Sequence, residues 1–258
     1  MQTGRRFLLK AGLALAAIAT APRALLAAAW PADAFKSEAA AAAMNSLFGT
    51  DAATPSDQIT LGVPTIAENG AVVPIEVSTT LANVQSISIV VPNNPRPLAA
   101  NFVLSAGVVP EISSRIKMGK TSDVIAVVKT DAGLFSTSQE VQVTIGGCGG
   151  EETAMASKIK VKARLSGNVA DVQSLMMHPM ETGTRKDPDT GEAVPVHHIT
   201  QLTFVHNGEV ALEANLSTAV SKNPYFRFKL NGANSGDTLV VKWVDNLGET
   251  DELETVLK

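Results

Sequence analysis

Residues 122–133, SDVIAVVKTDAG, and the similar residues 236–248, GDTLVVKWVDNLG, decide the fold. Each stretch has a polar entry, then a run of aliphatic residues that includes a lysine, then an Asp-containing turn that ends in glycine. Short aliphatic runs rich in β-branched residues and bounded by turn residues are typical of strands. The two stretches therefore predict a strand followed by a tight turn in each half of the chain.

Similar runs occur along most of the sequence, separated by clusters of Gly, Pro, Asn and Asp. Many short strands with turn signals between them indicate an all-β protein built from β-sandwiches. A chain of 258 residues is long for one sandwich and natural for two small domains. The expected strands are residues 59–63, 71–79, 84–91, 98–104, 113–118, 124–129, 140–145, 159–166, 170–177, 197–206, 209–216, 225–230, 238–245 and 252–257.

Two further pairs of short segments suggest that the halves are related. Asn69-Gly70 resembles Asn207-Gly208, and Asn94-Pro95 resembles Asn223-Pro224, in the same order along each half. One interpretation is a duplication. The other is that all β-sandwiches use the same turn residues, so the likeness is chemical rather than ancestral.

The first 29 residues predict an export signal. Arg5, Arg6 and Lys10 form a basic start, an apolar stretch follows, and alanines 27–29 offer small residues for cleavage. The apolar stretch is too short for a permanent bilayer span, so no membrane anchor is expected. The run GRRFLLK at residues 4–10 is similar to a twin-arginine signal, the alternative being an ordinary secretory signal. After it, an alanine-rich segment predicts a helix over about 35–48, stopped by Gly49.

Charge bears on the class of partner. The whole chain has 21 Lys and Arg and 25 Asp and Glu, and the signal contains four of the cations and no acid. The mature formal charge is then 17 − 25 = −8. An acidic protein is not expected to bind nucleic acid.

The chain has one cysteine, Cys148, in the sequence Gly146-Gly147-Cys148-Gly149-Gly150. An exported protein with a single cysteine cannot form an internal disulfide, so Cys148 is either a reactive thiol or an intermolecular link. The four glycines place no side chain beside the sulfur and allow backbone conformations closed to other residues. We therefore expect an accessible thiol, and a disulfide-linked homodimer through Cys148 is a further expectation.

The neighbourhood of Cys148 predicts an attachment point rather than a catalytic nucleophile. A catalytic cysteine needs a base within hydrogen-bond reach, and the closest basic residue in sequence is Lys158. An unassisted thiol has a pKa near ~8.5, so a partner enzyme would have to supply activation. Residues 146–157 span at most ~40 Å, enough to project the thiol from a domain. The alternative without a chemical function is a glycine-rich linker that contains a cysteine by chance.

Several segments resemble the SoxYZ sulfur-oxidation carrier. IAENGAVVP at 66–74, NPRPL at 94–98 and the Gly-Gly-Cys-Gly-Gly loop resemble SoxY, whereas HPMETGTRKD at 178–187 resembles SoxZ. The resemblance implies two immunoglobulin-like β-sandwich domains in tandem, without catalytic activity of their own. It also implies a sulfur intermediate bound covalently to Cys148, with no other cofactor, and periplasmic partners of the SoxAX, SoxB and SoxCD types. The expected division is a signal at 1–29, a SoxY-like domain at 30–145, the carrier loop at 146–157 and a SoxZ-like domain at 158–258.

One departure from the family keeps alternatives open. In SoxY the motif ends the chain, whereas here the chain continues through Glu151 into the second domain. The protein could instead be a carrier or interaction module for another periplasmic oxidoreductase, of the kind that serves quinoprotein dehydrogenases. A third hypothesis is a thiol enzyme, with Cys148 as nucleophile and a histidine such as His178 as base.

Other residues carry weaker signals. Arg185 and Lys186, in a polar loop rich in turn formers, are candidate docking residues, although solvated charges are the more common outcome. The MMHPM run at 176–180 has the thioether and imidazole groups that suit Cu(I), but strand-end packing followed by a turn is the preferred interpretation, and the resemblance to SoxZ already accounts for the segment. The pair His197-His198 lacks a supporting carboxylate or cysteine pattern, and His206 is expected to be exposed. No metal site is therefore predicted.

Overall fold

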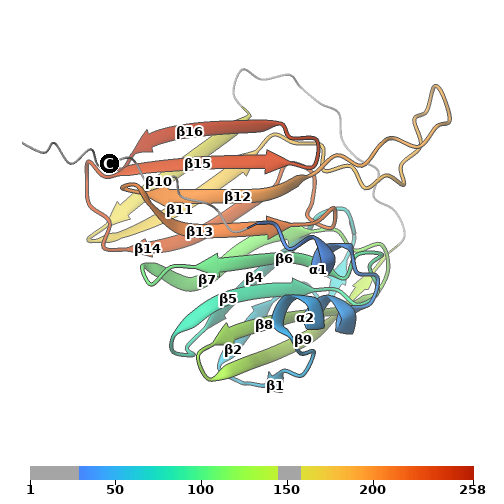
Figure 1. The fold of residues 1–258 in the computed structure, drawn as a ribbon, viewed down its shortest axis with the longest axis horizontal. Helices are drawn as coiled ribbons and strands as arrows, with labels where there is room; N and C mark the ends of the chain where they lie inside the picture. The colour runs from blue at the N-terminus through green and yellow to red at the C-terminus, as the bar shows by residue number, and fades with distance from the viewer. Residues whose placement is uncertain (1–28, 145–157) are drawn as a thin grey trace, which may run out of the picture.

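The computed structural model describes residues 29–144 and 158–258, and the all-β prediction is confirmed. Two short helices precede sixteen strands that form two stacked sheets (Figure 1). The elements are α1 (Ala32–Lys36), α2 (Ala40–Phe48), β1 (Thr54–Pro55), β2 (Ile59–Gly62), β3 (Ile66–Ala67), β4 (Val73–Thr79), β5 (Val84–Val90), β6 (Leu98–Leu104), β7 (Val108–Ile116), β8 (Ser122–Thr130), β9 (Gly133–Val143), β10 (Ile159–Ser166), β11 (Val169–Met176), β12 (Ile199–His206), β13 (Glu209–Leu216), β14 (Tyr225–Asn231), β15 (Thr238–Asp245) and β16 (Thr250–Val256).

The two sandwich halves share both sheets. One sheet has the order β1-β9-β8-β5-β6-β13-β12-β15-β16, and the other has the order β10-β11-β14-β7-β4-β2. The halves meet where β6 pairs with β13 and where β7 pairs with β14, both antiparallel. Main-chain hydrogen bonds therefore cross the seam in both layers, and one apolar core runs through both halves.

The strand order is repeated in reverse across this seam. Reading outward, β6-β5-β8-β9 corresponds to β13-β12-β15-β16, and β7-β4-β2 corresponds to β14-β11-β10. The stretches 122–133 and 236–248 occupy equivalent strands, β8 and β15, as their likeness indicates. The other two likenesses do not match: Asn69-Gly70 precedes β4, whereas Asn207-Gly208 joins β12 to β13. Asn94 lies between β5 and β6, whereas Asn223 precedes β14, so turn chemistry explains both pairs.

Aromatic side chains pack across the seam. The Phe102 and Phe226 rings meet edge to face with centroids 5.7 Å apart, joining β6 of one sheet to β14 of the other. Both rings are almost completely buried. Strand alternation sends Phe102 inward while its neighbour Val103 is 42% exposed, as a half-buried sheet requires.

The N-terminal helical segment is broken in two, which corrects the single helix expected over 35–48. Ser37 is extended and ends α1, and Ala39 is extended and precedes α2. Gly49 does end α2, in the left-handed conformation. The helices lie on the outer face of the ten-stranded sheet (Figure 1), where Phe35 and Met44 form a second apolar cluster with residues of β5, β6 and β8.

Several strand limits differ from the sequence expectation. β9 begins at Gly133 rather than near 140, because a tight turn after β8 fixes its pairing although its early residues alternate weakly in hydropathy. β7 begins at Val108 rather than 113, and Pro110 lies inside it. The short strands β1 and β3 were not expected at all.

Candidate functional site

The predicted attachment residue and its glycines, Cys148, Gly146, Gly147, Gly149 and Gly150, lie outside the described residues. The structure does describe both points at which the folded body holds this segment, namely Thr144 and Lys158. These two anchors and their surroundings are therefore the part of the site whose geometry is known.

The first anchor is the end of β9. β3 pairs with it in parallel, with Ala67 opposite Val143. The Thr144 amide then donates to the Ala67 carbonyl at 3.1 Å, and the Thr144 hydroxyl donates to the Glu68 carbonyl at 3.2 Å. The strand that leads to Cys148 is thus held by main-chain bonds up to the last described residue.

Gly70 makes the close packing at this anchor possible. A Cβ at Gly70 would overlap the Met118 carbonyl oxygen and lie 2.8 Å from the Val143 Cγ1 atom. The Met118 amide also donates to the Gly70 carbonyl at 2.7 Å. Only glycine lets the backbone approach so closely, so the segment before β4 can lie flat against the end of β9.

The second anchor is Lys158, just before β10. Its carbonyl accepts the Met177 amide at 2.6 Å. Its ammonium lies 3.3 Å from the Glu249 carboxylate and 5.6 Å from the centre of the Trp243 ring. The described chain therefore resumes at Lys158, beside the turn that connects β15 and β16.

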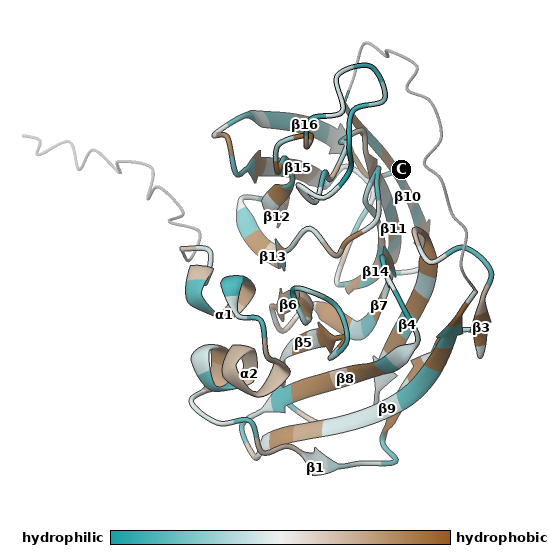
Figure 2. Ribbon diagram, turned by 90° about the vertical axis from the view of Figure 1, so that its right-hand side faces the viewer, coloured by the Kyte–Doolittle hydropathy of each residue, from teal (hydrophilic) through white to brown (hydrophobic). Residues whose placement is uncertain are grey.

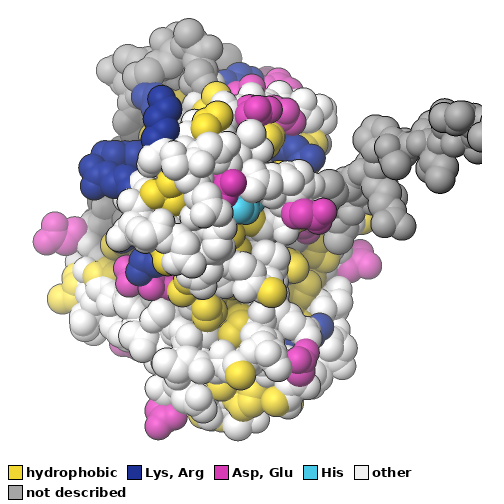
Figure 3. All heavy atoms as spheres, turned by 90° about the vertical axis from the view of Figure 1, so that its left-hand side faces the viewer, with side chains coloured by type: hydrophobic (Ala, Val, Ile, Leu, Met, Phe, Trp, Pro, Cys, Tyr) yellow, Lys and Arg dark blue, Asp and Glu magenta, His cyan; other side chains and the backbone are white. Residues whose placement is uncertain are grey.

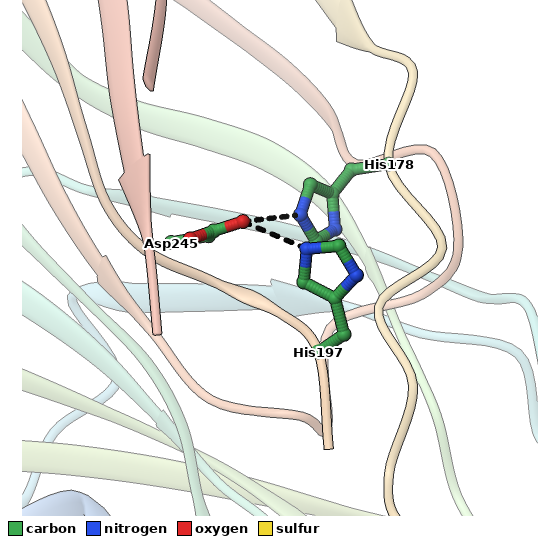
Figure 4. A group of neighbouring side chains, drawn as sticks. All are labelled: His178, His197 and Asp245. Carbon is green, nitrogen blue, oxygen red and sulfur yellow. Dashed lines mark hydrogen bonds and ion pairs between the residues drawn. The ribbon is translucent and has the colours of Figure 1, made fainter. Parts of the chain in front are cut away.

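Next to this second anchor lies a cluster formed by His178, His197 and Asp245 (Figure 4). The His197 Nε2 atom lies 2.7 Å from the Asp245 Oδ2 atom, and the His178 Nε2 atom lies 3.4 Å from the same oxygen. Their imidazole rings are edge to face at 4.5 Å. His178 is 3% exposed, and the Asp245 side chain is completely buried.

The hydrogen bonds of His178 define its protonation. The Met180 amide donates to the His178 Nδ1 atom at 3.2 Å, so that nitrogen carries a lone pair and the proton of the neutral ring is on Nε2. The Nε2–H group then donates to Asp245. A metal bound at Nε2 would require the proton to move to Nδ1, against the Met180 N–H. The cluster is therefore arranged as a hydrogen-bonded triad rather than as a set of metal ligands.

The charges in the cluster follow from burial and these bonds. Burial lowers the pKa of His178 to about 4, although the bond to Asp245 opposes the shift. Burial alone would raise the pKa of Asp245, but bonds from His197 and from the Leu247 and Glu249 amides bring it below its ordinary value. The triad at neutral pH is thus a neutral His178 beside an ionised Asp245.

A half-buried lysine, Lys117, joins the two halves close to the triad. Lys117 directly follows β7, and its ammonium group donates to the carbonyls of Met180 and Thr218. Burial lowers the pKa of Lys117 to about 8, with Glu181 acting in the opposite direction. The segment at 178–181 therefore packs against the first half through hydrogen bonds as well as apolar contacts.

The remaining sequence candidates separate into surface and core. Arg185 and Lys186 are exposed, on an excursion that projects from the body (Figure 1). Arg185 donates through Nε and Nη2 to the Glu181 Oε1 atom at 2.9 and 2.6 Å, so its charge is matched within the loop. Met176 and Met180 are buried, and the Met180 sulfur accepts the Ile199 amide, which accounts for the run without copper.

The other histidines also find defined places. His197 is partly exposed and His198 buried, but both precede β12, which begins at Ile199 rather than at the expected residue 197. Burial lowers the pKa of His198 to about 4. His206 is not freely exposed as expected, because its Nε2 atom pairs with the Asp237 Oδ2 atom at 2.8 Å. What the sequence missed is the Asp245 carboxylate, 48 positions after His197, since only the pairing of β12 with β15 brings the two together.

Two family models match the chain: Sulfur oxidation protein SoxY over residues 44–148, and Sulphur oxidation protein SoxZ over residues 159–256. The matches follow one another and together account for most of the sequence. The chain belongs to the SoxYZ-like sulfur-oxidation carriers. It is a fusion in which SoxY precedes SoxZ, and the family supports a carrier role and interaction with other Sox proteins. No curated protein matches the chain.

Solved structures similar to this SoxYZ-like chain include the sulfur carrier protein SoxY from Chlorobium limicola f thiosulfatophilum. It is 38% identical, with 40% of this chain and 94% of that chain covered and a TM-score of 0.37. Dpr2 Ig1-Ig2 in complex with DIP-Theta Ig1-Ig3 is 9% identical, covering 78% and 98% of the two chains, with a TM-score of 0.25. A marsupial T cell receptor is 8% identical over 77% and 99%, also with a TM-score of 0.25.

Within 29–144 and 158–258, no helix is long and apolar enough to cross a bilayer. The export signal at 1–29 stays a prediction, since residues 1–28 lie outside the described part.

Proposed function

We propose that the protein is an exported, periplasmic carrier that holds a sulfur intermediate covalently on Cys148 and presents it to partner enzymes. The observation that carries the proposal is the SoxY family match, which ends at Cys148 itself. The single-cysteine sequence supports it, because no internal disulfide can compete for the thiol.

The proposed loading step joins the Cys148 sulfur to the outer sulfur of thiosulfate. The thiol loses its proton, one S–S bond forms, and two electrons leave, so an electron acceptor on the loading enzyme is required. Hydrolysis of the terminal S–SO₃⁻ bond by water would then release sulfate and two protons and leave a persulfide on the cysteine. SoxAX, SoxB and SoxCD are the expected partner types for such a cycle.

The two anchors support presentation of the loop. Thr144 and Lys158 are both fixed by hydrogen bonds to the body, so Cys148 is tethered from two sides. Such a tether delivers a hairpin rather than a chain end into a partner's active site. This feature favours the second candidate function, in which the carrier serves another periplasmic oxidoreductase, such as one of the quinoprotein dehydrogenase type.

The geometry gives little support to the thiol-enzyme alternative with His178 as base. Both ring nitrogens of His178 are engaged, and the side chain is buried. His197 is more accessible, but its Nε2 atom is directed at Asp245. The proposal therefore assigns no catalytic residue to the chain.

The test is to incubate the mature protein and its Cys148→Ser variant with thiosulfate, with and without a loading enzyme of the SoxAX type. A carrier gains one adduct per chain only when enzyme and Cys148 are both present, and the protein alone shows no turnover. If the protein alone released product catalytically, and the His197→Ala variant did so more slowly, the protein would be an enzyme rather than a carrier. Equal labelling of the Cys148→Ser variant would show that Cys148 is not the attachment residue.

A further inference from the structure

One end of the sandwich exposes two long edge strands. Among the described strands, β10 has one neighbour in its sheet, β11, and β16 has one neighbour in the other, β15. Both lie at the same end of the molecule, where the two layers meet (Figures 1 and 2). They are 8 and 7 residues long. β16, and β10 over residues 161–166, therefore present main-chain N–H and C=O groups that could pair with another strand.

The equivalent strands at the opposite end are β2 and β9, and they are protected. β9 is followed in its sheet by β1, a two-residue strand that contains Pro55. β2 is only 4 residues long. Short strands and proline are usual ways of blunting a sheet edge, and neither is found in β10 or β16, whose edges carry charged side chains instead.

Apolar side chains reach this end without being fully covered. Val161, Ala163 and Leu165 of β10 and Leu253 of β16 pack against the core but are only partly buried. β10 and β16 approach each other here, at the corner of the sandwich, and a second surface would cover what these side chains leave exposed.

The outer faces of the two strands have opposite charge. Lys160, Lys162 and Arg164 are exposed on β10, whereas Glu252 and Glu254 are exposed on β16. Basic side chains gather at this end in the face shown by Figure 3. Among the salt bridges of the described residues, none involves Lys162, Arg164, Glu252 or Glu254.

We propose that this end binds a second copy of the chain, with β10 of each copy pairing with β16 of the other about a two-fold axis. The two-fold axis lies in the interface and runs along the strands. Rotation about it brings the six-stranded sheet of one copy into line with the ten-stranded sheet of the other, so both β10–β16 pairs form together. The basic row of one copy then lies beside the acidic row of the other as cross-strand pairs. Pairing of β10 with β10, or of β16 with β16, would oppose like charges.

The pairing uses every feature of this end. The outward main-chain groups of β16 and of residues 161–166 of β10 find partners, and the partly buried side chains of β10 and β16 are enclosed. The dimer is independent of Cys148, so it differs from a disulfide-linked dimer by surviving reductant and weakening with salt. It also leaves the anchors Thr144 and Lys158 on the same copy.

Sedimentation of the mature Cys148→Ser protein in reductant, over a range of protein and salt concentrations, tests the proposal. The first variant is Lys162→Glu with Arg164→Glu, the second is Glu252→Lys with Glu254→Lys, and the third combines all four. Lys129→Glu, an exposed change of the same kind on β8 in the other half, is the matched control. Circular dichroism and melting confirm that each variant is folded.

The dimer dissociation constant should rise by about tenfold or more in each of the first two variants and rise with salt in the parent. The variant with all four substitutions should recover close to parental affinity, because the charges of β10 and β16 are complementary again with their signs exchanged. The control should be unchanged. A monomer at every concentration would overturn the proposal, as would a dimer insensitive to both double variants, or a variant with all four substitutions that dimerises no more tightly than either.

Discussion

The two ends of the sandwich are built from equivalent strands but are finished differently. At the SoxY end, β1 with Pro55 covers β9, and β2 is short. At the SoxZ end, β16 and β10 are long and carry rows of opposite charge. A sheet edge can thus be covered by another strand of the same chain. It can also stay uncovered and carry a row of charges that favours pairing with a strand of opposite charge, as in the dimer proposed above. Equivalent topology does not imply equivalent interactions.

The turns after the equivalent strands β8 and β15 show the same contrast. Asp131 follows β8, is exposed, and accepts one bond from the Gln85 side chain. Asp245 ends β15, is buried, and accepts bonds from two histidines and from two backbone amides of the next turn. The same sequence pattern gives a surface turn in one half and a buried hydrogen-bonded cluster near Lys158 in the other.

Breaking the seam that the halves share should have the largest effect. Phe102→Ala removes a buried ring that contacts Phe226 across both layers and leaves a cavity. We expect a loss of about 3–5 kcal/mol in the free energy of unfolding, measured by denaturant titration. Val103→Ala, the exposed neighbour on the same strand, should cost less than about 0.5 kcal/mol. Equal costs would mean that the seam is not a packed core.

The buried cluster around Asp245 sharpens the comparison of the two turns. Asp245→Asn leaves two imidazole N–H groups competing for a single weaker acceptor in a buried site. The expected loss is about 2–4 kcal/mol. Asp131→Asn, at the equivalent exposed turn, should leave the unfolding midpoint nearly unchanged. A large effect at Asp131 or none at Asp245 would contradict the distinction drawn between the halves.

The anchor at β9 depends on one glycine. Gly70→Ala forces the Met118 carbonyl and the Val143 side chain to move, with an expected cost of about 1–3 kcal/mol. Hydrogen exchange should show faster opening of the Thr144 amide in this variant. Gly119→Ala, where an added Cβ meets nothing within 4 Å, is the control. Unchanged exchange at Thr144 would show that the anchor does not need close packing.

Acid should destabilise the fold through two histidines of the SoxZ half. His178 and His198 have pKa values of about 4 in the fold against 6.5 in the unfolded chain. Protons therefore bind the unfolded chain preferentially, so their contribution to stability is complete above pH 6.5 and is lost as pH falls towards 4. Melting followed from pH 7.5 to 4.5 should show this decline, and His198→Phe should reduce it. A flat profile would mean that these rings are protonated in the fold.

The fold was largely predictable from local pattern, since strand periodicity and turn residues identified most strands in both halves. The broken helix, the start of β9 and the strands β1 and β3 were not, because tertiary pairing rather than hydropathy sets them. For the candidate site, the glycine pattern singles out Cys148, whereas the triad could not be foreseen. Its members His178, His197 and Asp245 are brought together only by strand pairing and a turn.

The intact mass of freshly purified mature protein, with and without reductant and beside Cys148→Ser, tests the carrier claim most directly. The account predicts additions equal to sulfur or sulfonate groups that reductant removes and that the serine variant lacks. A single unmodified mass, unchanged after incubation with thiosulfate and partner enzymes of the SoxAX, SoxB and SoxCD types, would contradict it.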